Sequence, residues 1–185
     1  PRASYDAART GSQNRHHWAA ADDLSANAAA DPEVRRKLRR RARHERDNNP
    51  VLNGLVRTIA HETVGTGPRL LLGLGDEYRD AARLVEDQFR RWCRAVGLAD
   101  KLRVMREARP IDGEAFGLMT STPTLRHPVK LDLRLVEADQ VDTPTLSALD
   151  PNAVSGIEFD AHGNPAFYHV LKQHPGDSGY WNWSG

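Results

Sequence analysis

The chain has 185 residues and a formal net charge of +1, because 26 lysines and arginines nearly balance 25 aspartates and glutamates. Its 39% hydrophobic and 28% charged content is ordinary for a globular protein, and its longest apolar run, Leu70–Leu72, is far too short to cross a bilayer. The lone cysteine, Cys93, excludes an intrachain disulfide and a cysteine-based zinc site. Attraction to nucleic acid must come from a local cluster of charge, since the whole chain is nearly neutral.

The first third of the chain predicts helices. Ser12 is positioned to cap a short helix, and Asp31-Pro32-Glu33 supplies an N-cap, a proline at the first helical position and an acid in the first turn. We expect that second helix to run from Pro32 to about Asp47. The pair Asn49-Pro50 starts another helix, over about residues 50–63, because proline disfavours helix in the residue before it.

The segment Gly65-Thr66-Gly67-Pro68 then interrupts the helical pattern. We place the main boundary of the chain there, which predicts a helical N-terminal arm over residues 1–64 and an α/β region over residues 65–185. Residues Arg69–Leu74 follow as a short predicted strand.

The next segment has the most regular helical pattern of the chain. Its apolar residues recur at steps of four and three and predict one buried stripe, formed by Tyr78, Ala82, Val85, Phe89, Trp92 and Val96. We expect Asp76 to cap this helix and Gly97 to end it. If Trp92 is buried, replacing it with alanine should cost about 3–5 kcal/mol. A further helix should extend from Leu98 to Pro110.

The rest of the chain predicts strands and makes the fold class α+β. Residues Glu114–Thr120 form the first, and residues Lys130–Glu137 alternate, with Leu131, Leu133 and Leu135 on one face. A hairpin should pair residues Ile157–Phe159 with residues Phe167–Leu171 through a loop that contains Gly163. The tail, residues Ser178–Gly185, has no periodicity and is predicted as a loop.

Motifs for catalysis are incomplete. His61-Glu62 begins a zinc-protease helix motif, but position 65 is glycine where the second histidine belongs. Gly176-Asp177-Ser178-Gly179 is interpreted as a turn. Four acids lie at strand ends, where a small hydrolase would place catalytic groups, although solvated loops are the favoured interpretation: Asp112, Glu114, Glu137 and Asp139. We therefore predict no catalytic residue, no metal ligand and no cofactor.

One basic segment stands out. Between positions 35 and 46 there are eight basic residues and a single acid, Glu45. The basic residues are Arg35, Arg36, Lys37, Arg39, Arg40, Arg41, Arg43 and Arg46. On a helix they surround all but a thin apolar seam, and arginine is suited to bidentate contacts with phosphate or carboxylate. Two interpretations stay open: contacts with nucleic-acid phosphates, or a solvated face that pairs with acids of a neighbouring chain.

Ordered blocks across nearly the whole chain resemble the N-terminal part of phage portal proteins of the lambda family. In order, the blocks are Tyr5–Ala8, Asn14–Trp18, the arginine-rich segment closing on Asn48–Pro50, Gly65–Gly67, Asp112–Phe116, Leu133–Val141 and Gly156–Val170. Each block alone is a weak pattern, and their shared order makes the resemblance specific.

The resemblance implies a structural protein rather than an enzyme. Portal proteins of this family form a dodecameric ring at one vertex of the phage head, and double-stranded DNA is packaged and ejected through its channel. The implied partners are further copies of the chain, the terminase, and capsid, scaffold and head-completion proteins, with no membrane. The implied location is the virion, and the host cytoplasm during assembly. The sequence is expected to cover the start of the portal wing and to lack stem, clip and crown.

Overall fold

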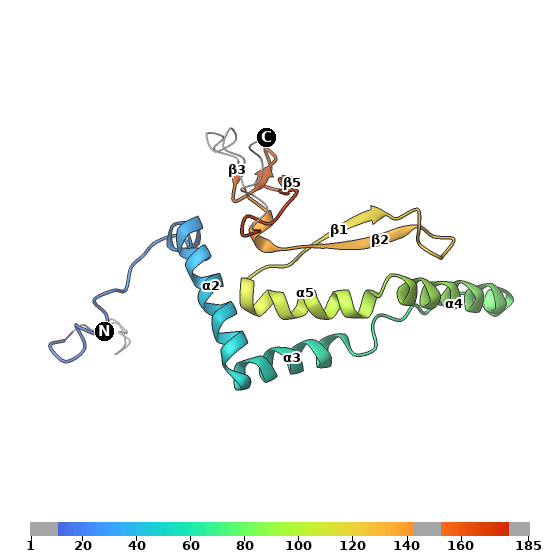
Figure 1. Ribbon diagram of the computed structural model, residues 1–185, viewed down its shortest axis with the longest axis horizontal. Helices are drawn as coiled ribbons and strands as arrows, with labels where there is room; N and C mark the ends of the chain where they lie inside the picture. Colours follow the sequence, from blue (N-terminus) through green and yellow to red (C-terminus); the bar gives the residue numbers. More distant parts are fainter. Residues whose placement is uncertain (1–10, 143–152, 178–185) are drawn as a thin grey trace, which may run out of the picture. The chain divides into compact units, whose positions relative to one another are not determined.

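The computed structural model describes residues 11–142 and 153–177 and divides into two compact units, residues 1–36 and 37–185 (Figure 1). The Tyr5–Ala8 block and the predicted C-terminal loop lie outside the described residues. In the first unit, residues 12–20 form turns, so the predicted helix after Ser12 is wrong. The physical reason is local, because the Asn14 side chain accepts a hydrogen bond from Gly11 N at 2.7 Å and favours a turn. The short helix α1 (Ala26–Ala29) follows.

Helices α2 (Pro32–Asn48) and α3 (Pro50–Val64) confirm the predicted helices to within one residue. Asp31 Oδ1 accepts from Glu33 N and Val34 N at 2.8 and 2.9 Å, which satisfies two free donors at the start of α2. Asn49 does the same for α3, with Val51 N and Leu52 N as donors.

Residues 69–74 form no strand, so that prediction is wrong. Instead of pairing with a neighbouring strand, Leu72 N donates to Glu86 Oε1 at 2.8 Å. Glu86 belongs to α4 (Arg79–Ala95), which follows the 3-10 turn η2 (Asp76–Tyr78). Asp76 does not cap this segment with its side chain and forms an ion pair with Arg79.

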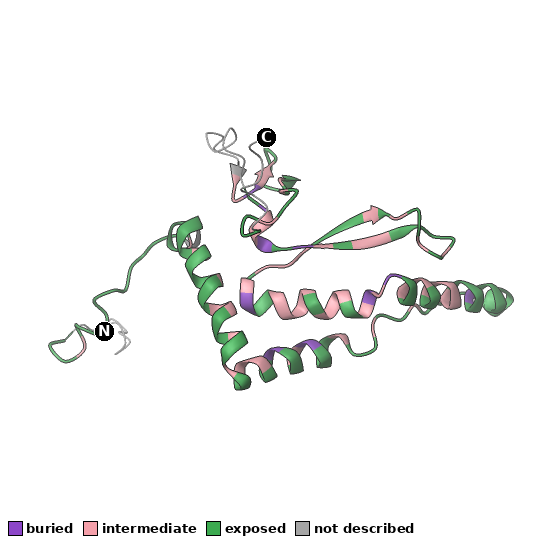
Figure 2. Ribbon diagram, viewed as in Figure 1, coloured by how far each residue is buried: buried purple, intermediate pink, exposed green. Residues whose placement is uncertain are grey.

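The apolar stripe of α4 is buried only in part (Figure 2). Ala82 and Val96 are buried, whereas Tyr78 and Val85 are 56% and 49% exposed. Trp92 is half-buried, and its Nε1 donates to Leu131 O at 2.8 Å. The prediction of one continuous buried stripe is therefore wrong, and the cost expected for a fully buried tryptophan does not apply.

Helix α5 (Leu98–Asp112) begins after Gly97, whose φ of 62° ends α4 in the left-handed region. It continues through Pro110 to Asp112, two residues beyond the predicted end, and Gly113 is its C-cap. Helix α3 packs beside α5 (Figure 1). The small core of this region includes Val56, Ala60, Leu98 and Ile111. The division at residue 64 stays a prediction.

The strands confirm the α+β class. Strands β1 (Phe116–Ser121) and β2 (Leu131–Val136) are antiparallel, with Phe116 opposite Val136. After the 3-10 turn η3 (Ala138–Gln140), strands β3 (Ala153–Val154), β4 (Ile157–Phe159) and β5 (Pro165–Tyr168) form a second antiparallel sheet. The predicted hairpin is confirmed as β4–β5, although β5 covers Pro165–Tyr168 and not the predicted Phe167–Leu171. No helix in the described residues has the length and apolar character to span a bilayer.

Candidate functional site: an arginine–carboxylate cluster

Helix α2 presents Arg39 and Arg43, one turn apart, to three carboxylates of the same unit. Arg43 Nε donates to Asp112 Oδ1 at 2.7 Å, and its Nη1 donates to Asp139 Oδ2 at 2.6 Å. Arg39 Nη1 donates to the other oxygen of Asp139 at 3.1 Å, and its Nη2 forms an ion pair with Glu114. Asp139 thus bridges both arginines. We call these five residues the arginine–carboxylate cluster.

Three separate pieces of the chain bring the acids to α2. Asp112 is the last residue of α5, Glu114 precedes β1, and Asp139 lies in η3 just after β2. A capping box fixes η3, in which the Glu137 side chain and the Gln140 side chain each bond to the backbone of the other residue. Arg39 Nε also donates to the carbonyl of Asp112 at 3.1 Å. The cluster therefore ties α2 to α5 and to one end of the β1–β2 pair, where β1 begins and β2 ends.

The cluster is held by charge in a partly desolvated place. The side chains of Arg39 and Asp112 are each only 13% exposed. Burial alone would raise the pKa of Asp139, but hydrogen bonds and charge from Arg43 and Arg39 outweigh it and lower that pKa. For Arg43, burial acts to lower the pKa, and contacts with Asp112 and Asp139 outweigh it and raise the pKa. Both shifts favour the charged pair.

His174 borders the cluster. Its Nδ1 accepts a hydrogen bond from Gly176 N at 2.9 Å, so the neutral ring carries its proton on Nε2. That Nε2 lies 3.5 Å from Asp139 Oδ2 and 3.6 Å from Glu137 Oε2. The polarity of the Nε2–H suits these two carboxylates, which adds a contact between the chain after β5 and η3.

The four acids that the sequence places at strand ends have different surroundings in the structure. Asp112, Glu114 and Asp139 come together on the arginines, whereas the Glu137 side chain stays 65% exposed at the edge. Asp112, Glu114 and Asp139 each form an ion pair with an arginine. Their arrangement suits a structural tie better than hydrolysis.

The structure also divides the eight basic residues of α2 into different surroundings. Arg39 and Arg43 lie in the cluster, Arg35 is half-buried, and Arg46 forms an ion pair with Asp47 at 2.8 Å. The other four are exposed: Arg36, Lys37, Arg40 and Arg41. Sequence reasoning missed this division. The available signal was the four-residue spacing of Arg39 and Arg43, which places them on one face of the helix.

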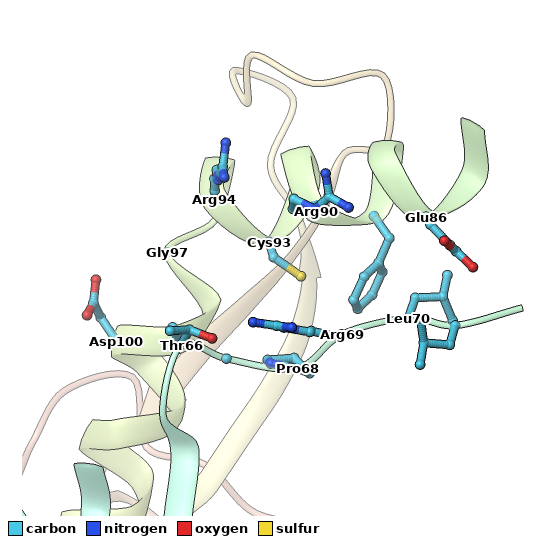
Figure 3. Close-up of a pocket in the computed structure, with 14 residues that line it drawn as sticks. Thr66, Pro68, Arg69, Leu70, Glu86, Arg90, Cys93, Arg94, Gly97 and Asp100 are labelled. Atoms are coloured by element: carbon cyan, nitrogen blue, oxygen red, sulfur yellow. The ribbon is translucent and has the colours of Figure 1, made fainter. Parts of the chain in front are cut away.

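A second feature is a pocket of about 780 Å³ between residues 66–71, α4 and the start of α5 (Figure 3). The Arg69 side chain extends into it below the sulfur of Cys93, whereas Arg94 points away. Burial raises the pKa of the Cys93 thiol, so the thiol stays protonated and is a poor nucleophile. Within the described residues, no group of three histidine, cysteine or acidic side chains is placed to hold a metal ion.

Comparison with known families adds one match. The family model described as "Phage portal protein, lambda family" matches residues 11–183, which include every residue of the arginine–carboxylate cluster and the hairpin β4–β5. No curated protein matches the chain.

Proposed function

Because the chain belongs to the lambda family of phage portal proteins, we propose that it is a subunit of the ring at the head vertex through which the terminase packages DNA and from which DNA is ejected. The family is structural and non-enzymatic. The observation that carries the proposal is the match over residues 11–183, since it spans both units rather than one motif. The chain acts in this proposal without cofactor or catalytic residue.

The arginine–carboxylate cluster supports a structural role. It joins α2, α5, η3 and the start of β1 through hydrogen bonds of 2.6–3.1 Å and an ion pair with Glu114. Charged ties of this kind fix orientation even where their net contribution to stability is modest.

Exposed apolar side chains also support assembly with neighbours. Leu71, Leu84 and Val51 are 83%, 63% and 80% exposed, although large apolar residues normally leave water on folding. The proposed neighbours are further copies in a dodecameric ring, together with the terminase and with capsid, scaffold and head-completion proteins. The ring would belong to the virion, after assembly in the host cytoplasm.

A second candidate is a stand-alone module that binds nucleic acid through α2, which the exposure of Arg40 and Arg41 favours. Native mass measurement of the full-length protein separates the two. For a portal ring, we expect one particle mass that is a whole-number multiple of the subunit mass. A stable monomer that binds DNA would favour the module and count against the ring.

A further inference from the structure

Strand β1 has one edge whose backbone groups are unpaired. Thr122 N donates to Lys130 O at 2.8 Å, so these opposite residues are a hydrogen-bonded pair of the β1–β2 ladder. Such pairs alternate along an antiparallel ladder, which directs the backbone groups of Gly117, Met119 and Ser121 away from β2. We find no bonding partner for these groups within the described residues. We call this row the free edge of β1.

The two edges of the β1–β2 pair differ. At the β2 edge, Leu131 O accepts from Trp92 Nε1 at 2.8 Å and Leu133 N donates to the Asp132 side chain at 2.7 Å. Proteins usually protect an open edge with charged residues, proline or a bulge. Strand β1 contains no charged residue or proline, and its register with β2 is unbroken. Its free edge is therefore suited to bind a further strand.

The chain also contains an unpaired extended segment, residues 69–74. Residues 67–75 include no helix, turn or bend, and among the described residues the segment makes no backbone–backbone hydrogen bond. Figure 3 shows the chain running from Pro68 past Leu70 along α4. Since Leu72 N donates to Glu86 of α4, the backbone groups of its neighbours Leu71 and Gly73 point away from that helix in an extended chain. The segment thus has a free edge of its own.

We propose that residues 69–74 of one copy of the chain add as an antiparallel strand to the free edge of β1 in a second copy. This inference rests on the proposed function, which places copies side by side in a ring, and it names the contact between them. Antiparallel pairing is the commoner kind, and every strand pair of the described residues is antiparallel.

Pairing the two segments centre to centre places Leu71 opposite Met119. These side chains are 83% and 55% exposed, and the pairing covers both on one face of the sheet. On the other face, Leu72 lies opposite Leu118, which is 47% exposed. Arg69 is the only charged residue of either segment, so no like charges meet across the pair.

A second copy is favoured over another protein because the chain supplies both halves of the contact. Residues 69–74 match the six-residue length of β1, and the two free edges are different surfaces of the chain. A contact between different surfaces is head-to-tail, so it repeats from copy to copy and closes into a ring where the rotation permits. Pairing β1 with another β1 would stop at two copies.

The test is disulfide cross-linking in the full-length protein with Cys93, the one cysteine of the sequence, replaced by alanine. Two single-cysteine proteins with different tags, Met119→Cys and Leu71→Cys, are co-expressed so that they assemble together. Directly opposite residues of paired strands are close enough for a disulfide. Ser121→Cys with Arg69→Cys is a second pair in the same register. Leu118→Cys with Leu71→Cys is the matched control, because these residues would lie on opposite faces.

We expect both register pairs to give, on oxidation, a product of twice the subunit mass that carries both tags and is lost on reduction. The control pair and each single-cysteine protein alone should give none. A product from Met119→Cys alone would overturn the inference by showing that β1 pairs with itself, and an equal product from the control would overturn the register.

Particle mass, measured on the same samples and on the unsubstituted protein, separates the inference from the proposed function. Rings that persist while neither register pair links would overturn the inference and leave the ring intact. An unsubstituted protein found only at the subunit mass would overturn the proposed function, and this contact with it.

Discussion

At the scale of single residues, the main feature is that adjacent arginines of one helix have different surroundings. Arg39 and Arg43 are bound by carboxylates from α5 and η3, and their neighbours Arg40 and Arg41 are exposed. The sequence predicts a basic helix and four acids at strand ends, but it does not predict that they meet. Residues 39 and 139 are brought together only by tertiary packing, for which the local pattern holds no signal.

Asp139→Asn should destabilise the protein by about 1–3 kcal/mol, because it leaves two partly buried guanidinium groups short of a charged acceptor. The measurement is the free energy of unfolding in urea. Asp87→Asn is the control, since Asp87 pairs with Arg90 and Arg91 on the exposed surface of α4, where ion pairs contribute little. Equal losses in the two variants would contradict the special role of Asp139.

The lowered pKa of Asp139 sets the direction of its pH dependence. Its stabilisation is fully present above the unfolded-state pKa of about 3.9 and is lost as the pH falls through the lower folded-state pKa. The stability difference between the unsubstituted protein and Asp139→Asn should therefore be constant near neutral pH and shrink below about pH 4. Urea unfolding at a series of pH values checks this, and a difference that grows on acidification would refute it.

At the scale of elements, the helix starts were predictable because their signals are local. Asp31 and Asn49 cap α2 and α3 with their own side chains. The failures have tertiary causes. Residues 69–74 have the composition of a strand, but Leu72 N donates to the side chain of Glu86. In the stripe that ends with Val96, Tyr78 and Val85 are exposed, although Ala82 between them is buried.

Two glycines near the second sheet share a φ of 80° but differ in their surroundings. A Cβ on Gly163 would meet no atom within 4 Å, whereas a Cβ on Gly156 would lie 2.6 Å from Asp142 N. Gly163→Ala should cost about 1–2 kcal/mol through backbone strain alone. Gly156→Ala should cost at least about 1 kcal/mol more, because backbone must move to admit the methyl group. Urea unfolding of both variants tests this, and equal costs would show that the close approach is unimportant.

At the scale of the whole molecule, the small core and the family match both favour a chain that assembles with neighbouring subunits. The buried apolar residues of the described chain are few and mostly small, and larger side chains such as Leu71, Leu84 and Phe167 are exposed. A stand-alone domain of this length would be expected to bury more of its apolar surface. The ordered blocks of sequence predicted the family that the comparison identifies, although no catalytic or binding motif indicated it.

The central claim is that this portal-family chain acts as a subunit of a closed ring. The mass of the full-length protein in solution, measured particle by particle at moderate salt, tests that claim most directly. A single dominant species at the mass of a dodecamer is the result that we predict. A population made only of monomers at every concentration and salt would contradict it.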